Sequence, residues 1–438
     1  MGGLHLRQRA RARLAPPGRR EPRLRWGATT QQQARAIACP MPTKPKASRA
    51  ASSRTRGSSM EDASKALVLQ GGGALGAYQG GVYEALLERD DKLDWVAGVS
   101  IGAVNAALIA GNAPENRVAK LREFWELVSS GPGQSLPVGW GDRTAASQWS
   151  AASATMMGIP GLFRPRMDGM LLLGGTAPVL SYYDTSPLKS TLERLVDFDR
   201  INRREMRLSV GAVDVRTGNS VYFDNQTHKI SALHIMASSA LPPGFPPVHI
   251  DGADYWDGGI LSNTPLQYVL DSIPRTRRLV VLQVDLFGAR GPMPKTFSET
   301  IERQKDITYS SRTRMNTDVM ATNVNLQQSL ADLLDRLPAR MRNDPAVTAL
   351  CAQLKHKPVD IVHLIYRNKP YELDSKDYEF SRAMVREHWD AGGRDMRATV
   401  SHPEWMKSAT ENGITTYDLA EPEAVRVRHP VVLKAQPK

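Results

Sequence analysis

Two short apolar runs, each followed by a longer segment with helical spacing, open the patterned part of the chain. Residues 66–70 and 95–99 are short and apolar, as buried strands are. Residues 77–87 and 101–110 follow them, and apolar positions recur there at helical intervals. Alternation of strand and helix predicts an α/β fold with a mainly parallel sheet and helices on its faces.

The same pattern continues after a long interruption. Strands are expected at residues 206–215, 220–224 and 278–286, with Thr217-Gly218-Asn219 joining the first two. Residues 131–183 separate them from the early strands and are rich in Gly, Pro, Met and Trp. This stretch is either loop with minor helix or a cap over an apolar site, and the apolar run at 156–163 is the reason to consider a cap.

Beyond about residue 290 the alternation gives way to polar helical sequence. One isolated strand is expected at residues 359–366 and a helix near residues 375–391. The aromatic residues Tyr378, Phe380 and Trp389 on that helix are interpreted as packing residues, and no chemistry is apparent in the region. The expected organisation is a basic tail (1–60), an α/β domain (61–290) and a mostly helical C-terminal extension (291–438).

Charge is distributed unevenly along the chain. The 438 residues include 57 Lys or Arg and 45 Asp or Glu, a net charge of +12. The first 60 residues hold fourteen of the basic residues and one acid, Glu21, so the remainder carries 43 basic and 44 acidic residues. A nucleic-acid groove needs basic residues on the folded body, and we therefore expect no nucleic-acid binding there.

The basic tail is rich in Arg, Ala, Ser and Pro and has little with which to form a core, so it is expected to be disordered. It has three readings: an organelle transit peptide, a polybasic arm for anionic lipid or nucleic acid, and a mis-assigned start ahead of Met41 or Met60. We favour the mis-assigned start.

The remaining composition points to a reducing compartment. Cys39 lies in the tail and Cys351 in the body, which argues against an internal disulfide and against a zinc site built from cysteine. The sequence has no run of eighteen apolar residues and no apolar segment behind the N-terminal charges. We expect a cytoplasmic protein without a transmembrane helix or secretory signal.

A glycine loop, Gly71-Gly72-Gly73-Ala74-Leu75-Gly76, follows the first strand and opens the first helix. Residues without Cβ let backbone N–H groups converge at a helix N-terminus, where the dipole favours negative charge. The loop also matches a dinucleotide fingerprint, but that fingerprint needs an acid at the end of the next strand. Asp94 precedes that strand instead, so the loop can hold an anion but lacks the acid that the dinucleotide fingerprint requires.

The second strand ends in Gly98-Val99-Ser100-Ile101-Gly102, a G-x-S-x-G sequence between a strand and a helix. This is the pattern of a nucleophile elbow, in which the glycines permit a tight turn and the Ser hydroxyl is exposed at the head of the helix. The alternative is a serine that only caps a buried helix. A nucleophile beside an anion-binding loop is what acyl transfer requires, and the combination favours Ser100 as nucleophile.

A base for Ser100 was sought first among the nine histidines. His228, His234 and His249 lie between the later strands without a distinctive setting. Asp257-Gly258-Gly259 is the better candidate, because the paired glycines let the aspartate approach another backbone closely. A simple turn is the competing explanation.

In this order and spacing, the GGGALG, GVSIG and DGG sequences resemble those of the patatin-like phospholipases, over roughly residues 65–285. Residues 237–248 look like the family's segment ahead of the aspartate, and the region after 290 resembles an extension found in a bacterial subset of the family. The resemblance implies a three-layer α/β sandwich and a Ser-Asp dyad without histidine. Many members carry Arg or Lys where this chain has Leu75, which leaves the preference for substrate charge open.

The resemblance assigns roles residue by residue. Ser100 is the nucleophile in the elbow of Gly98 and Gly102, and Asp257 is the base, supported by Gly258 and Gly259. The oxyanion hole comprises Gly71, Gly72, Gly73 and Gly76, with the donors around Gly72 and Gly73.

The predicted activity is hydrolysis of lipid carboxylic esters through an acyl-enzyme, with peripheral contact to a lipid surface and with neither cofactor nor metal. Because an aspartate of pKa about 3.9 is a poor base, the pKa of Asp257 should be raised by burial. The alternatives are a Ser-His-Asp esterase, a catalytically silent lipid-binding or scaffold member, and a nucleotide-binding protein.

Overall fold

The computed structural model describes residues 63–89, 92–132, 143–166, 180–272, 278–354, 358–367, 372, 375–402, 414–419 and 426–428. The predictions made for the basic tail lie outside the described residues. The division of the body at residue 290 stays a prediction.

The core of the fold is a central sheet with strand order β12-β11-β10-β9-β1-β2-β5-β8-β7, in which β6 pairs with β5. Its six middle strands are all parallel: β11 (Ile414–Asp418), β10 (Val359–Ile365), β9 (Leu279–Asp285), β1 (Ser64–Leu69), β2 (Trp95–Gly98) and β5 (Arg207–Asp214). The antiparallel strands are β12 (Arg426–Arg428), β6 (Ser220–Asp224), β8 (Ala253–Asp257) and β7 (Val248–Ile250). The strands predicted from the sequence are present within one or two residues of their expected bounds.

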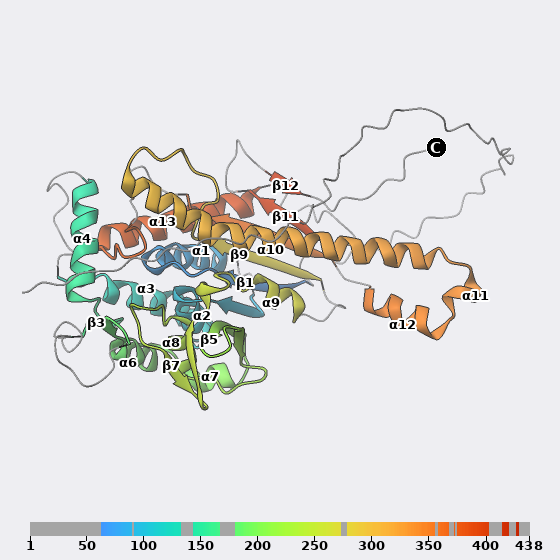
Figure 1. The fold of residues 1–438 in the computed structure, drawn as a ribbon, viewed down its shortest axis with the longest axis horizontal. Helices are drawn as coiled ribbons and strands as arrows, with labels where there is room; N and C mark the ends of the chain where they lie inside the picture. Colours follow the sequence, from blue (N-terminus) through green and yellow to red (C-terminus); the bar gives the residue numbers. More distant parts are fainter. Residues whose placement is uncertain are drawn as a thin grey trace, which may run out of the picture. The chain divides into compact units, whose positions relative to one another are not determined.

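Helices cover both faces of this sheet, as Figure 1 shows. Alternate residues of β1 enter two separate cores: Leu67 and Leu69 face one, and Ala66 and Val68 face the other. The helices that contribute to the first core include α1 (Ala77–Leu87), α2 (Ile101–Ala110), α3 (Arg117–Val128), α6 (Ser186–Leu195), α8 (Ala232–Ser238) and α13 (Arg382–Ser401). The second core is covered by α9 (Leu266–Asp271) and, through Val324, by α10 (Phe297–Asp335). The predicted α/β three-layer architecture is confirmed.

Strand order reverses at β1, which has β2 on one side and β9 on the other. In open parallel sheets, the carboxyl ends of the strands at such a reversal border a crevice in which ligands bind. The glycine loop follows β1 and Ser100 follows β2. The topology therefore places both at this crevice.

The stretch considered as a cap contains α4 (Arg143–Met157) and the two-stranded pair β3 (Arg164–Pro165) and β4 (Tyr183–Asp184). Its remaining parts, 133–142 and 167–179, lie outside the described residues. Short helices complete this half of the chain: η3 (Pro114–Asn116), α7 (Phe198–Asn202) and η4 (Gly258–Ile260).

The C-terminal residues are joined to the same sheet. The strand expected to be isolated is β10, which pairs in parallel with β9, and α13 packs along α1. The helix expected over residues 375–391 begins only at Arg382, because the Ser381 side chain accepts a hydrogen bond from the Met384 N–H and caps it. Residues 375–378 form a turn instead.

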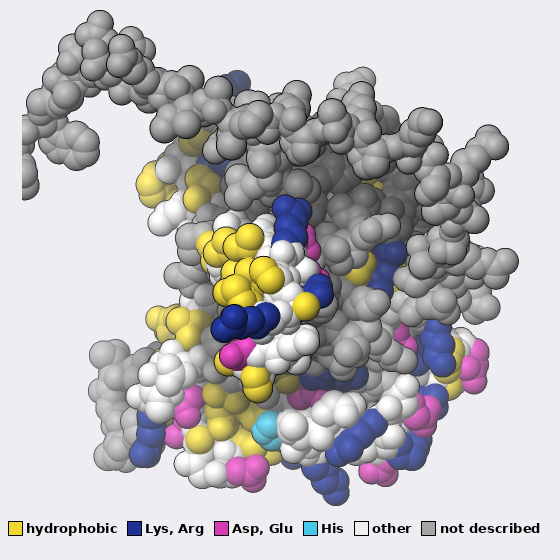
Figure 2. Space-filling view, turned by 90° about the vertical axis from the view of Figure 1, so that its right-hand side faces the viewer, with side chains coloured by type: hydrophobic (Ala, Val, Ile, Leu, Met, Phe, Trp, Pro, Cys, Tyr) yellow, Lys and Arg dark blue, Asp and Glu magenta, His cyan; other side chains and the backbone are white. Residues whose placement is uncertain are grey.

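The end of α10 continues into α11 (Ala339–Arg342) and α12 (Pro345–Leu354). Figure 2 shows this face of the molecule, where hydrophobic side chains gather among Lys and Arg side chains. Leu326, Leu330 and Leu333 are exposed on α10, and Met341 is exposed on α11. None of the helices in the described ranges is both long and apolar enough to cross a membrane.

Candidate active site

Ser100 occupies a strained turn between β2 and α2. Its backbone has φ 56° and ψ −127°, a conformation that non-glycine residues rarely adopt. The Ser100 N–H donates to the Ser238 carbonyl at 3.0 Å, and the Ser239 hydroxyl donates to the Ser100 carbonyl at 3.1 Å. The Ser100 side chain makes no capping hydrogen bond to α2. These observations favour the nucleophile elbow over a simple helix cap.

The two glycines of the elbow are required sterically. A Cβ on Gly98 would lie 2.2 Å from the Gly102 carbonyl oxygen, and a Cβ on Gly102 would lie 2.4 Å from that of Leu69. Both contacts are with backbone, which cannot move aside as a flexible side chain can. The turn can therefore form only with glycine at both positions.

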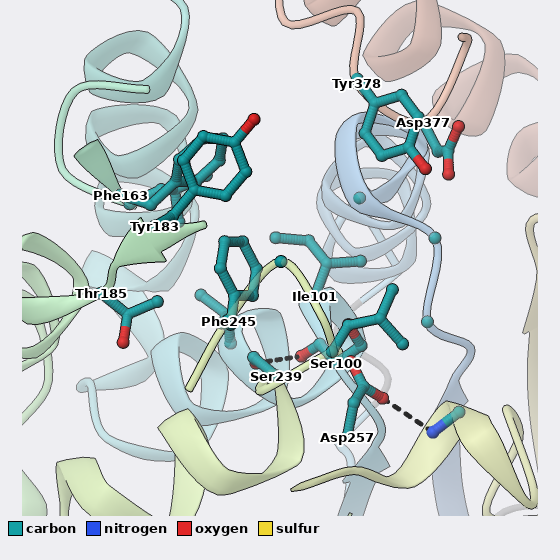
Figure 3. A pocket seen from close by; sticks show the side chains of 18 of the residues that line it. Ser100, Ile101, Phe163, Tyr183, Thr185, Ser239, Phe245, Asp257, Asp377 and Tyr378 are labelled. Atoms are coloured by element: carbon teal, nitrogen blue, oxygen red, sulfur yellow. Dashed lines mark hydrogen bonds between the residues drawn. The ribbon is translucent and has the colours of Figure 1, made fainter. Parts of the chain in front are cut away.

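Asp257 ends β8 and lies beside Ser100 (Figure 3). The residue is 2% exposed, and its Oδ1 accepts a hydrogen bond of 2.7 Å from the Gly259 N–H. A Cβ on Gly258 would lie 2.6 Å from the Gly211 carbonyl oxygen, so this glycine lets the end of β8 approach β5. The sequence motif thus corresponds to a close approach that brings the carboxylate to the serine.

Burial changes the acidity of this aspartate. Removal from water raises the pKa of Asp257 from 3.8 to about 7, and hydrogen bonds from the Ser100 side chain and the Gly259 N–H limit the rise. A carboxylate with a pKa near neutrality is a far stronger base than a solvated one.

The glycine loop divides into donors and packing positions. The Gly71 N–H donates to the Asn263 carbonyl, whereas the N–H groups of Gly72 and Gly73 donate to no other described residue. All three residues line the cavity in front of Ser100. Gly76 ends the short helix η2 (Gly73–Gly76), where a Cβ would lie 2.7 Å from Ile101. Gly76 is not among the lining residues, so its observed role is close packing beneath the loop.

Buried polar side chains that the motifs did not reveal hold the glycine loop. Asn263 Nδ2 donates to the Gly71 carbonyl at 2.8 Å. Gln70 Oε1 accepts from the N–H groups of Leu286 and Phe287, and Asn105 Nδ2 donates to the Gly76 carbonyl at 3.0 Å. The sequence signal that could have identified two of these residues is a polar side chain inside an apolar element. Asn105 lies within the apolar stretch 101–110, and Gln70 ends the first apolar run.

A cavity of about 410 Å³ opens above Ser100 and Asp257, within the size range of ligand pockets. Figure 3 shows Phe163, Tyr183 and Phe245 along one side and Asp377 with Tyr378 across from them. The three rings pack together, with centroid distances of 4.7, 5.2 and 6.1 Å. Further apolar lining comes from Ile101, Val104, Leu162, Leu188, Leu241 and Phe287.

The charged side chains among the described lining residues are Asp257 and Asp377, and no Lys, Arg or His belongs to that set. Leu75 stands where many patatin-like phospholipases carry a basic residue. It is fully buried and does not line the cavity either. The described lining of the cavity is therefore mostly apolar and offers no cation to an anionic group.

Two interpretations of the sequence change here. Tyr378 and Phe380, taken as packing residues, both line the cavity, and Tyr378 is 49% exposed. The region after residue 290, in which no chemistry was apparent, thus forms one wall of the site. Trp389 packs as expected, since it is buried against α1 at Gly80. The apolar stretch considered as a cap contributes Leu162 and Phe163 to the cavity.

Two family models match the sequence. A model described as patatin-like phospholipase matches residues 67–270, which include Ser100 and Asp257, and a model described as patatin phospholipase matches residues 307–412. Both models describe patatin phospholipases, and the second match lies in the C-terminal extension.

Three solved structures show remote similarity. VipD from Legionella pneumophila is 14% identical over 75% of this chain and 67% of that chain, with a TM-score of 0.28. Human GIVD cytosolic phospholipase A2 is 12% identical over 78% of this chain and 60% of that chain (TM-score 0.31). The type III effector protein ExoU is 16% identical over 76% and 54% (TM-score 0.23). This chain thus spans less than two thirds of the latter two. A comparison with curated proteins finds no match.

Proposed function

We propose that the protein is a lipid acyl hydrolase in which Ser100 attacks the ester and Asp257 is the general base. The observation that carries the proposal is the pairing of Ser100 with Asp257. Ser100 has a strained backbone and makes no side-chain hydrogen bond to the helix, and Asp257 is buried with a pKa of about 7. The matches to patatin phospholipase models and the apolar cavity support a lipid ester as substrate.

The reaction follows from the positions of these groups. Asp257 takes the hydroxyl proton as Ser100 Oγ bonds to the ester carbonyl carbon, and the carbonyl oxygen becomes an oxyanion. The N–H groups of Gly72 and Gly73 then donate to this oxygen, and the N-terminus of α2 stabilises negative charge beside Ser100. The Asp257 carboxyl returns its proton to the departing alcohol, which leaves an acyl-enzyme. In the second half, Asp257 takes a proton from a water molecule that attacks the acyl-enzyme. The fatty acid leaves as Ser100 Oγ regains its proton.

The described histidines support a dyad over a Ser-His-Asp triad. His234 is engaged with Ser231, His249 with Asp254, and His388 with Glu372. No described histidine lines the cavity. A proton acceptor beside Ser100 is therefore available in Asp257 and not in these residues.

The cavity rim supports contact with a lipid surface. Met156 and Met157 follow the lining residue Thr155 on α4 and are 76% and 57% exposed, and Tyr182 is 64% exposed. The Tyr182 N–H donates to the Pro243 carbonyl, and Pro243 lines the cavity. Exposed apolar side chains beside an acyl pocket fit the lipid interface. Replacing both methionines by glutamate should weaken binding to phosphatidylcholine vesicles and leave hydrolysis of a soluble ester intact; equal vesicle binding would contradict this role.

Covalent labelling tests the proposed enzyme class. A fluorophosphonate should label the wild-type protein and fail to label Ser100→Ala, and wild-type protein should release fatty acid from mixed membrane lipids. A silent lipid-binding member or a nucleotide-binding protein predicts no Ser100-dependent labelling. Labelling that persists in Ser100→Ala would refute the assignment of the nucleophile.

A further inference from the structure

The turn at residues 375–378 lies directly against the glycine loop. The Ala74 N–H donates to the Asp377 carbonyl at 2.9 Å. Gly73, with φ 55°, approaches the same carbonyl so closely that a Cβ would lie 2.1 Å from its oxygen. The neighbouring N–H groups of Gly72 and Gly73 are the proposed oxyanion donors. A residue from the C-terminal part of the chain therefore contacts the loop that carries them.

Two ion pairs hold this turn to α10. Lys376 Nζ lies 2.6 Å from Asp306 Oδ1, and Lys305 Nζ lies 2.7 Å from Asp377 Oδ1. Two neighbouring residues of the turn, Lys376 and Asp377, thus pair with two neighbouring residues of α10. The arrangement, named here the 305/306–376/377 clamp, fixes both the position and the direction of the turn.

The Lys376–Asp306 pair of the clamp is shielded from water, so neither charge can exchange its partner for solvent. The Lys376 side chain is fully buried, and Asp306 is 5% exposed. Glu302, one turn earlier on α10, is a second partner of Lys376 at 3.2 Å, and the Phe287 ring lies 5.8 Å from its ammonium. A buried ammonium without its carboxylates would be strongly unfavourable, so the turn has little freedom to move from α10.

We propose that Lys376 and Asp306 are positioning residues for the oxyanion hole, and this inference rests on the proposed function. Their ion pair anchors the turn, the Asp377 carbonyl anchors the Ala74 N–H, and the loop thereby presents its free N–H groups at a fixed place. Neither side chain lines the cavity, so neither contacts the substrate. The C-terminal extension is then a component of the catalytic apparatus.

The expected consequence is a selective loss of transition-state stabilisation. Removing an oxyanion donor lowers kcat by about 10²–10³, and a misplacement of about 1 Å at a reacting centre costs up to about 10². Loosening the clamp should therefore lower kcat by roughly 10–100-fold and change KM by less than about threefold, because the acyl pocket is left intact. The affinity for a trifluoromethyl ketone, which forms a tetrahedral oxyanion with the serine, should fall by the same factor as kcat.

Asp306→Asn and Lys376→Met are tested in the full chain with a short-chain p-nitrophenyl ester. Arg278→Met is the matched control, because Arg278 and Asp360 also form a buried pair, 2.6 Å apart and 8% and 3% exposed, at the opposite end of β9. The control should lose thermal stability and retain kcat. If Lys376→Met does not fold, Asp306→Asn keeps the side-chain volume and a hydrogen-bond acceptor and provides the same comparison.

The outcomes separate this inference from the proposed function. Folded clamp variants with lowered kcat, preserved KM and weakened ketone binding support it. A folded Asp306→Asn with wild-type kcat and ketone affinity overturns it, and so does a kcat loss equal to that of Arg278→Met. A wild-type protein without Ser100-dependent hydrolysis would instead refute the proposed function itself.

Discussion

The replacement of Asp257 by asparagine should abolish activity and at the same time stabilise the folded protein. Asp257 is 2% exposed in the wild type, and burial raises the pKa of its carboxyl from 3.8 to about 7. Ionising it in the folded state is therefore disfavoured, whereas the unfolded chain ionises it freely. Asparagine has nearly the same shape, remains neutral, and its oxygen can still accept from the Gly259 N–H.

The magnitude follows from the two pKa values. At 1.36 kcal/mol per pKa unit, the difference between 3.8 and about 7 corresponds to about 4 kcal/mol. Because the pKa of Asp257 is raised in the folded protein, its contribution to the free energy of unfolding of the wild type is fully present below pH 4. This contribution declines as pH rises between 4 and 7, and it is absent above pH 7. Asp257→Asn should thus match the wild type near pH 4 and exceed it by up to about 4 kcal/mol at pH 8.

Urea unfolding of both proteins between pH 4 and pH 8.5 measures this difference. Asp251→Asn is the control for the loss of one carboxyl, because Asp251 is an exposed residue in the turn between β7 and β8. A gap between wild type and Asp257→Asn that is independent of pH would refute the reasoning, since the carboxyl would then not titrate near neutrality in the folded protein.

Three further changes have defined outcomes. Gly102→Ala places a Cβ 2.4 Å from the Leu69 carbonyl oxygen, so ester hydrolysis should fall at least about 10²-fold, and a crystal structure with an undisturbed elbow would contradict this. Phe245→Ala enlarges the aromatic side of the cavity, so a series of p-nitrophenyl esters should show the optimum moving to longer chains, whereas a uniform loss at all lengths would count against acyl binding there. Ending the chain at residue 290 removes β10 from β9 and α13 from α1, so the product should aggregate, and a monomeric product with normal activity would show that the extension is dispensable.

The parts of the site that were predictable from sequence depend on local backbone geometry. The elbow at Ser100 needs glycine two residues away on each side, and the approach of Asp257 needs glycine directly after it, so the chemistry leaves a short pattern in the sequence. Strand and helix order was predictable for a similar reason, because buried strands such as β1 and β9 are nearly continuous apolar runs.

The rest depends on contacts between distant residues. Asp377 and Tyr378 reach the cavity because β10 joins the sheet and α13 docks on α1, and no short pattern near residue 377 encodes those contacts. A short pattern can also include a residue that lies away from the site. Gly76 belongs to the glycine motif, but it lies at the end of η2, in the packing below the cavity wall.

The central claim is that Asp257 is the base for Ser100, and the rate of acylation measures it most directly. A p-nitrophenyl ester mixed rapidly with enzyme at pH 8 gives a burst of product whose rate reports formation of the acyl-enzyme. Asp257→Asn should suppress this burst as completely as Ser100→Ala does, while substitution of any of the nine histidines leaves turnover within about tenfold of wild type. A histidine variant as inactive as Ser100→Ala, or a normal burst in Asp257→Asn, would contradict the dyad.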